Sequence, residues 1–299
     1  MTTELIGGLA RVGRTAGSGD VGKRPSALAR LFRRPSTVIS AGFLLLLVIL
    51  AIAASWIAPH DPTAQDIAKS FAPYSGDHPL GTDDLGRDVA SRLIYAVRLA
   101  LLAPLISVGV ALVLGVPSGL WAGLRRGVVD TVISRLADTL LSLPGLAFAL
   151  AVVAVLGPGL TNAMVALGVV FAPSLFRVVR GAAMSVAEEP FVDSARAIGC
   201  STRRTLWVHI LPNVAAPLLV QTTILMGVAL LAEAGLSFLG LGVQAPAASW
   251  GSMLRTAYDN QFQAPLSVLP PGIAVVLTVL AFNTLGDAIR DTMTSRGRR

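Results

Sequence analysis

The stretch VISAGFLLLLVILAIAASWIA, residues 38–58, decides the fold because it carries no charged side chain over 21 residues. At 1.5 Å per residue, a helix of this length is about 30 Å long, which equals the thickness of the hydrocarbon core of a bilayer. A polar lead with a basic run at Arg30, Arg33 and Arg34 precedes it. A cleaved signal peptide has a short charged start and only about 7–15 apolar residues, so it fits poorly. We therefore predict a retained transmembrane helix over 38–58, preceded by a mobile basic tail over 1–37.

Five further apolar stretches are long enough to cross a membrane. They cover residues 97–123, 132–157, 161–180, 213–241 and 267–289. The chain is 54% hydrophobic and 14% charged, whereas a soluble domain carries about 25% charged residues. The sequence thus predicts an all-α, polytopic membrane bundle of six transmembrane helices. It would have an extracytoplasmic loop over 59–96, a five-helix core over 97–289 and a basic tail over 290–299.

The distribution of Lys and Arg predicts the orientation, because cytoplasmic loops of membrane proteins carry an excess of these residues. If the N-terminal tail is cytoplasmic, nineteen of the 24 basic residues lie on that side. The other side holds Lys69, Arg87, Arg92, Arg98 and Arg255. Both termini are therefore expected in the cytoplasm. The same bias accounts for the net charge of +7, so membrane lipid is an expected partner and nucleic acid is not.

The segment over 181–212 is cytoplasmic in this topology and too polar to cross the membrane. Negative charge at the start of a helix favours its N-terminal dipole, and Gly199 is placed to end such a helix. The acidic residues are Glu188, Glu189 and Asp193, and one side carries Phe191, Ala195 and Ile198. We predict a short helix within 188–205 across the cytoplasmic face, then a turn and re-entry at 210–212. An ordinary amphipathic linker is an equally good interpretation of these residues.

A turn-rich acidic segment, residues 78–88, precedes the second predicted span on the outer side. Asp83, Asp84 and Asp88 are close in sequence, and Arg87 is their expected partner. The preferred interpretation is a structural segment that fixes the start of the second span. Contact with an external binding protein is the weaker alternative, and metal binding by these acids is not expected.

The sequence offers no convincing set of ligands for a metal or a cofactor. The three histidines are scattered along the chain: His60, His78 and His209. The single cysteine, Cys200, permits neither an intrachain disulfide nor a cysteine cluster. Residues 17–23 resemble a phosphate-binding loop, but Arg24 stands where Ser or Thr would hold magnesium and no strand precedes them. No cofactor is therefore expected on this chain.

Glu233 is the acid placed well inside a predicted span. Burying an ion in a membrane is costly, so such a residue usually faces protein or a water-filled path. One interpretation is a residue of the pathway or gate. The other is a glutamate bonded to a neighbour near a helix kink, which Gly235, Gly240 and Gly242 favour because they indicate an irregular, closely packed region.

The loop over 181–212 resembles the EAA loop of the permease subunits of bacterial ABC importers. That loop has Glu-Ala-Ala, three residues, Gly, nine residues, then Ile-x-Leu-Pro. The corresponding residues here are Asp193-Ser194-Ala195, Gly199 and Ile210-Leu211-Pro212. The chain departs from the pattern at Asp193 and Ser194, and His209 occupies the position of the isoleucine.

Two further motifs narrow the resemblance to one branch of the family. The segments HPLGTDDLGRD over 78–88 and AEAGLSFLGLG over 232–242, which leads to Ser249-Trp250-Gly251, are similar to those of C-type permeases of dipeptide, oligopeptide and nickel importers. The likeness covers roughly residues 35–292. Three ordered motifs at the right spacing are a specific signal, whereas one alone would be weak.

The resemblance implies the fold of a type I ABC importer permease in the bacterial inner membrane. Such a subunit pairs with a second, similar permease, and ATP and Mg²⁺ bind to cytoplasmic ATPase subunits. A solute-binding protein outside the membrane delivers the cargo, and the permease itself is not an enzyme. The implied ATPase-coupling residues are Glu188, Glu189, Phe191, Asp193, Ala195, Arg196 and Gly199.

The cargo implied by this branch is a di- or oligopeptide. Nickel or another small solute is the alternative, because its importers share the same motifs. An ion-coupled secondary transporter is a different class, which would need several intramembrane charges and usually an inverted repeat. The sequence shows Glu233 deep in a span and no clear repeat.

Overall fold

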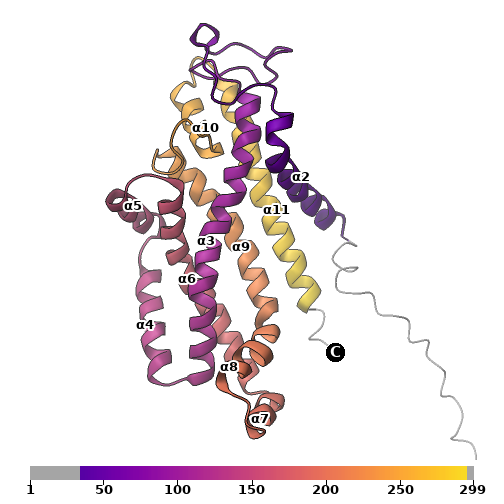
Figure 1. Ribbon diagram of the computed structural model, residues 1–299, viewed down its shortest axis with the longest axis vertical. Coiled ribbons are helices and arrows are strands. Elements are labelled where there is room, and N and C mark those ends of the chain that lie inside the picture. The colour runs from indigo at the N-terminus through magenta and orange to yellow at the C-terminus, as the bar shows by residue number, and fades with distance from the viewer. Residues whose placement is uncertain (1–33, 295–299) are drawn as a thin grey trace, which may run out of the picture.

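The computed structural model describes residues 34–294, apart from the side chains of Arg196 and Thr294. Five long helices run beside one another along the molecule (Figure 1). They are α2 (Pro35–Ile57), α3 (Val89–Arg125), α6 (Leu160–Ala187), α9 (Leu211–Phe238) and α11 (Leu269–Thr294). Residues 34–294 contain no β-strand, which confirms the all-α prediction. Of the tails expected over 1–37 and 290–299, residues 1–33 and 295–299 lie outside the described residues, whereas 35–37 belong to α2 and 290–294 to α11.

The shorter helices connect the long ones and lie mostly at the two ends of the bundle. They are α4 (Val128–Ser142), α5 (Gly145–Leu156), α7 (Pro190–Ala197), α8 (Thr202–Arg204), α10 (Trp250–Asp259), the 3₁₀ turns η1 (Ile67–Lys69) and η3 (Pro265–Val268), and the π-helical η2 (Thr205–Ile210). Residues 58–88 and α10 lie at one end, and α7 and α8 lie at the other (Figure 1). We refer to these as the α10 end and the α7 end.

The predicted span over 132–157 is not one continuous helix. The structure has two helices there, α4 and α5, bent by 88° at a short break. Leu143 has extended backbone angles, φ −86° and ψ 136°, because the ring of Pro144 disfavours the helical conformation of the residue before it. The six predicted crossings therefore correspond to five unbroken helices and one bent pair, if that pair crosses as a unit.

The second long helix begins earlier than its predicted first residue, 97. Asp88 is the N-cap of α3, and its side chain accepts a hydrogen bond of 2.7 Å from the Ser91 amide. This cap satisfies one of the free amides at the helix start. The first turns of α3 contain polar residues, so hydropathy alone does not locate the start of this helix. The loop predicted over 59–96 ends at residue 88 in the structure.

A row of glycines brings α3 against α6. A methyl group at Gly115 would lie 2.7 Å from the Ala172 carbonyl oxygen. One at Gly119 would lie 2.8 Å from the Phe176 carbonyl oxygen. Gly123 is equally close to α6, since a methyl group there would meet the Arg180 carbonyl oxygen at 2.9 Å. Small residues one turn apart allow helix backbones to approach this closely, a common way to pack membrane helices.

Ion pairs join α4 to the same helix, α6. Arg177 donates to Asp138 at 2.6 Å, and Arg180 donates through Nη2 to Asp130 at 2.7 Å. The two pairs are one helical turn apart on α6 and two turns apart on α4, so α4 lies along α6 through most of its length. Both acidic side chains of α4 are thus compensated by arginines of α6.

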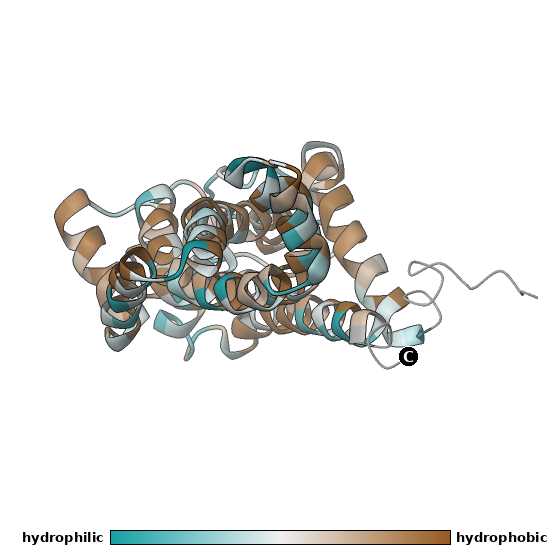
Figure 2. Ribbon diagram, turned by 90° about the horizontal axis from the view of Figure 1, so that it is seen from below, coloured by the Kyte–Doolittle hydropathy of each residue, from teal (hydrophilic) through white to brown (hydrophobic). Residues whose placement is uncertain are grey.

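Much of the remaining helix surface is apolar. Hydrophobic residues make up much of the helices at the edges of the bundle when the molecule is seen along its long axis (Figure 2). On α2, for example, Ile39, Leu45, Ile52 and Trp56 are all more than half exposed. Such a surface fits hydrocarbon or another membrane helix.

Candidate functional site

The α7 end presents a short helix beyond the long ones (Figure 1). Val192 and Ala195 are buried on the inner side of α7, which contacts α6 and η2. Phe191 is 42% exposed and Ile198 is 87% exposed. The expectation that Phe191, Ala195 and Ile198 share one side is wrong, because α7 ends at Ala197 and Ile198 lies beyond its last turn.

The turn after α7 depends on Gly199. Its φ of +83° lies in the left-handed region, and the Cys200 amide donates back to the Ala195 carbonyl at 3.0 Å. This is the Schellman arrangement that ends a helix at a glycine. The predicted helix within 188–205 is therefore two helices, α7 and α8, joined by this turn.

The acidic residues predicted for coupling have separate positions. Glu188 caps the C-terminus of α6, and its carboxylate accepts a hydrogen bond of 2.6 Å from Arg126. Glu189 is exposed just before α7, and Asp193 lies in the first turn of α7. The side chain of Arg196 lies outside the described parts of the chain.

A hollow of about 370 Å³ lies along α8 and η2 and is lined by Ser201, Arg203, Arg204, Trp207 and Val208. The last two belong to η2, whose π-helical turn bulges at the entry to α9 and closes with a bond from the Leu211 amide to the Leu206 carbonyl. π-turns of this kind are frequent at functional sites. The α7 end therefore combines exposed apolar side chains, two arginines and a recess, which together suit a docking surface.

The acidic segment at the α10 end is a buried polar network. Asp83 accepts from the Arg87 amide at 2.9 Å and from Arg87 Nε at 2.7 Å. Arg92 Nε lies 3.4 Å from the same carboxylate, and Arg92 Nη1 donates to the Pro62 carbonyl at 3.1 Å. Asp84 is the outer member, 3.5 Å from Arg87. The contacts tie the loop to the start of α3.

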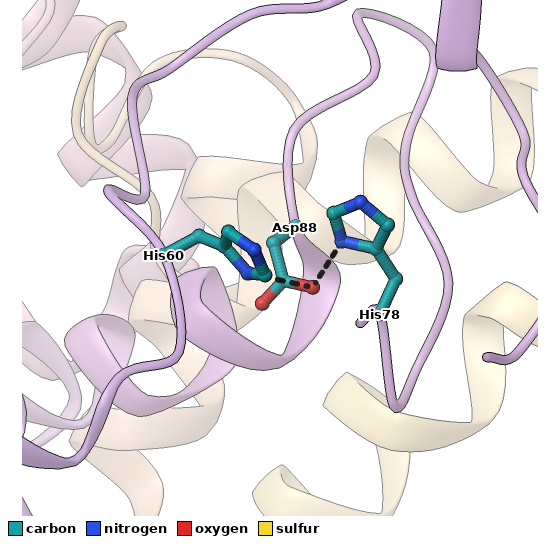
Figure 3. A group of neighbouring side chains, drawn as sticks. All are labelled: His60, His78 and Asp88. Atoms are coloured by element: carbon teal, nitrogen blue, oxygen red, sulfur yellow. Dashed lines mark hydrogen bonds and ion pairs between the residues drawn. The ribbon is translucent and has the colours of Figure 1, made fainter. Parts of the chain in front are cut away.

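Arg87 was the expected partner of Asp88, but it pairs with Asp83 and Asp84 instead. The Asp88 carboxylate caps α3 through Ser91 and lies 3.0 Å from His78 Nδ1. The side chain of His60 is on the other side of the same carboxylate (Figure 3). His60 follows α2 closely, whereas His78 lies further along the loop, so this grouping was not predicted from the sequence. The spacing of the three residues along the chain gives no sign of it.

Glu233 is 1% exposed in α9. Ser237 Oγ donates to its Oε1 at 2.6 Å, and the Ser249 hydroxyl is a second hydrogen-bond partner. Ser237 Oγ also accepts from the Val243 amide at 3.1 Å. The carboxylate thus joins α9 to the loop that leads into α10, which supports the interpretation of a glutamate bonded to its neighbours.

The motif around Trp250 completes this junction. The Ser249 hydroxyl accepts from the Ser252 amide at 3.2 Å and caps α10. Trp250 is buried, and its indole nitrogen donates to the Leu93 carbonyl at 3.2 Å. A side chain at Gly251 would clash with the Ala234 carbonyl oxygen, 2.3 Å from an added methyl group. The three residues lock α10 against α3 and α9.

Comparison with known proteins agrees with this architecture. Residues 115–299 match the family described as "Binding-protein-dependent transport system inner membrane component". Residues 26–73 match the "N-terminal TM domain of oligopeptide transport permease C". The chain belongs to this family of transport permeases. Two of the three motifs, over 193–212 and 232–251, fall inside the first match, whereas the motif over 78–88 lies between the two matched ranges.

Curated relatives align with the permease over most of their length. It is 43% identical to the di/tripeptide transport system permease protein DppC of Pseudomonas aeruginosa, over 84% of this chain and 85% of the relative. It is 38% identical to the glutathione transport system permease protein GsiD of Pectobacterium atrosepticum, over 88% of each. It is also 38% identical to the probable D,D-dipeptide transport system permease protein DdpC of Escherichia coli, over 87% of each.

The permease also shares its fold with a solved transporter. An inward-facing structure of the MetNI methionine ABC transporter aligns with a TM-score of 0.54 at 20% identity, over 67% of this chain and 95% of that one. The predicted fold of a type I ABC importer permease is therefore confirmed.

Replacing Glu233 tests whether it is structural. Glu233→Ala would leave two serine hydroxyls without their partner, and an unsatisfied buried group costs about 1–3 kcal/mol. We expect a lower melting temperature of the purified permease, while Glu233→Gln, which keeps an acceptor oxygen, loses much less. A gate residue would behave differently, since Glu233→Gln would then change transport while the melting temperature stayed near that of the wild type.

Proposed function

We propose that this chain is one of two permease subunits of an ATP-driven importer of di- or oligopeptides. The observation that carries the proposal is its membership of the permease family, with relatives named for peptide transport that align over more than four fifths of both chains. Its helices would form half of the translocation path, and the second permease would supply the other half. A solute-binding protein would deliver the peptide.

The proposed orientation places both termini and the α7 end in the cytoplasm. It rests on the excess of Lys and Arg on that side, since positively charged loops are retained in the cytoplasm. The α10 end, with the network around Asp83, then faces outward. There it would fix the start of α3 and lie near the incoming binding protein.

Coupling to ATP hydrolysis is proposed at the α7 end. Cytoplasmic ATPase subunits would bind ATP and Mg²⁺ and receive α7 in a groove, contacting Phe191, Ile198 and the arginines of the nearby hollow. The buried residues Val192 and Ala195 would transmit their movement to α6 and η2. Such coupling needs a rigid element with two discrete arrangements that both sites bias.

Reconstitution tests the proposal. Proteoliposomes that contain this chain, its partner permease and their ATPase subunits are supplied with the binding protein and a labelled dipeptide. We expect uptake that requires ATP and every subunit. Uptake by this chain alone, driven by an ion gradient, would contradict the assignment. ATP-driven uptake of Ni²⁺ with no peptide uptake would retain the importer and replace its cargo.

A further inference from the structure

Three side chains from separate segments meet at the α10 end (Figure 3). His60 follows α2, His78 belongs to the loop over 58–88, and Asp88 caps α3. His78 Nδ1 lies 3.0 Å and His60 Nδ1 lies 4.0 Å from Asp88 Oδ1. The two imidazole centroids are 4.8 Å apart. One carboxylate oxygen and two imidazoles thus surround a common point.

The Asp88 carboxylate is held in place through Oδ2, and its Oδ1 faces the two histidines. Asp88 Oδ2 accepts from the Ser91 amide and from the Ser91 hydroxyl, each at 2.7 Å. The same hydroxyl accepts from the His60 amide at 2.9 Å. Ser91 therefore positions both Asp88 and the backbone of His60, as outer-shell partners do around metal ligands.

The cluster is open on one side only. The side chain of Asp88 is 1% exposed and that of His78 is 13% exposed, whereas that of His60 is 42% exposed. His60 also lies in the wall of a cavity of about 690 Å³ that includes Asp61 and Tyr95. An ion can reach the cluster past His60 without disturbing the buried carboxylate.

We propose that His60, His78 and Asp88 bind one divalent transition-metal ion of the Zn²⁺ class. Two neutral imidazoles and a carboxylate are typical ligands of zinc, and three protein ligands leave the fourth tetrahedral position to water. Bonds of 2.0–2.1 Å place tetrahedral ligand atoms about 3.3 Å apart. The candidate ligand atoms all lie within 4.8 Å of one another, so a small rotation of the exposed His60 ring completes the geometry. Ca²⁺ and Mg²⁺ prefer oxygen ligands.

The bound ion would act as a staple at this end of the bundle. It would cross-link the end of α2, the loop and the start of α3, and so reinforce the hydrogen bond that already joins the His60 amide to Ser91. Binding to the folded chain alone stabilises it by mass action. The site is independent of the cargo and of the ATPase subunits, so it does not rest on the proposed function.

The test uses the full-length chain, purified in detergent with a histidine-free affinity tag and stripped with a chelator. Titration with ZnCl₂ by calorimetry, with bound metal counted by mass spectrometry, should give one ion per chain. His60→Ala and His78→Ala should each weaken Zn²⁺ binding at least tenfold and abolish the rise in melting temperature that Zn²⁺ causes. Equal concentrations of Mg²⁺ or Ca²⁺ should not compete.

The third histidine, His209, provides the matched control, since it lies at the α7 end in η2. His209→Ala should bind Zn²⁺ like the wild type. X-ray absorption at the zinc edge should show two imidazoles in the wild type and fewer in His60→Ala. Absence of stoichiometric binding, or affinity unchanged in both His60→Ala and His78→Ala, would overturn the site. Should His78→Ala misfold, His60→Ala decides, because the His60 side chain is the most exposed of the three.

Discussion

Ile198→Asp should abolish peptide uptake by the assembled transporter while leaving the permease itself folded. Ile198 is 87% exposed at the α7 end, so an aspartate there disturbs no internal packing. In the proposed complex it would place an unpaired charge within an apolar contact. Loss of a central apolar contact costs about 2 kcal/mol or more, which corresponds to about 30-fold weaker association with the ATPase subunits.

The measurement is co-purification of the ATPase subunits with the permease, together with ATPase activity stimulated by the loaded binding protein. Ile67→Asp is the matched control, because Ile67 is 74% exposed in η1 at the opposite end. It should leave ATPase association unchanged. Normal association and stimulation in a well-folded Ile198→Asp variant would remove α7 from the coupling interface.

Substitutions at buried positions of the same helix would be harder to interpret. Ala195 packs inward, so Ala195→Asp would damage the attachment of α7 to the rest of the bundle as well as coupling. Gly199→Val would strain a turn that requires a φ of +83°. Substitutions at the exposed residues Phe191 and Ile198 therefore test docking without disturbing folding. The sequence motif alone does not show which of its residues are exposed.

The parts of the fold that depend on local composition could be predicted from the sequence. The stretch over 38–58 nearly coincides with α2, Pro35–Ile57, because burial in hydrocarbon demands about 20 apolar residues in a row. The helix stop at Gly199 followed from its ability to adopt a positive φ. The bend between α4 and α5 also has a local cause, the dipeptide Leu143-Pro144. It could not be predicted with certainty from the sequence, because proline is common in membrane helices and does not always break them.

The contacts between distant segments could not be predicted in this way. The approach of His60 and His78 to Asp88 depends on how residues 58–88 fold over the bundle, which no periodicity encodes. The same holds for the partners of Glu233, since Ser249 comes from the start of another helix. Arg87 pairs with Asp83 four residues away and was predictable, whereas Arg92 reaches Pro62 across the loop.

The glycine contact between α3 and α6 leads to the second large effect, which concerns stability. Gly115→Ala and Gly119→Ala each place a methyl group under 3 Å from a backbone oxygen of α6. Overpacking of this kind costs about 1–3 kcal/mol per site, and whole domains are stable by only about 5–15 kcal/mol. The double variant should therefore melt at a much lower temperature, or fail to yield folded protein, when thermal unfolding of the purified chain is followed by circular dichroism.

Two other helix glycines give a matched comparison. Gly42 of α2 and Gly109 of α3 have no atom within 4 Å of an added methyl group. Gly42→Ala with Gly109→Ala should leave stability unchanged or raise it slightly, because alanine in a helix interior is favoured over glycine by about 0.5–1 kcal/mol. Equal melting temperatures for the two double variants would show that α3 and α6 do not pack through their glycines. A selective loss in Gly115→Ala with Gly119→Ala would show that the close approach of α3 to α6 at these glycines stabilises the bundle.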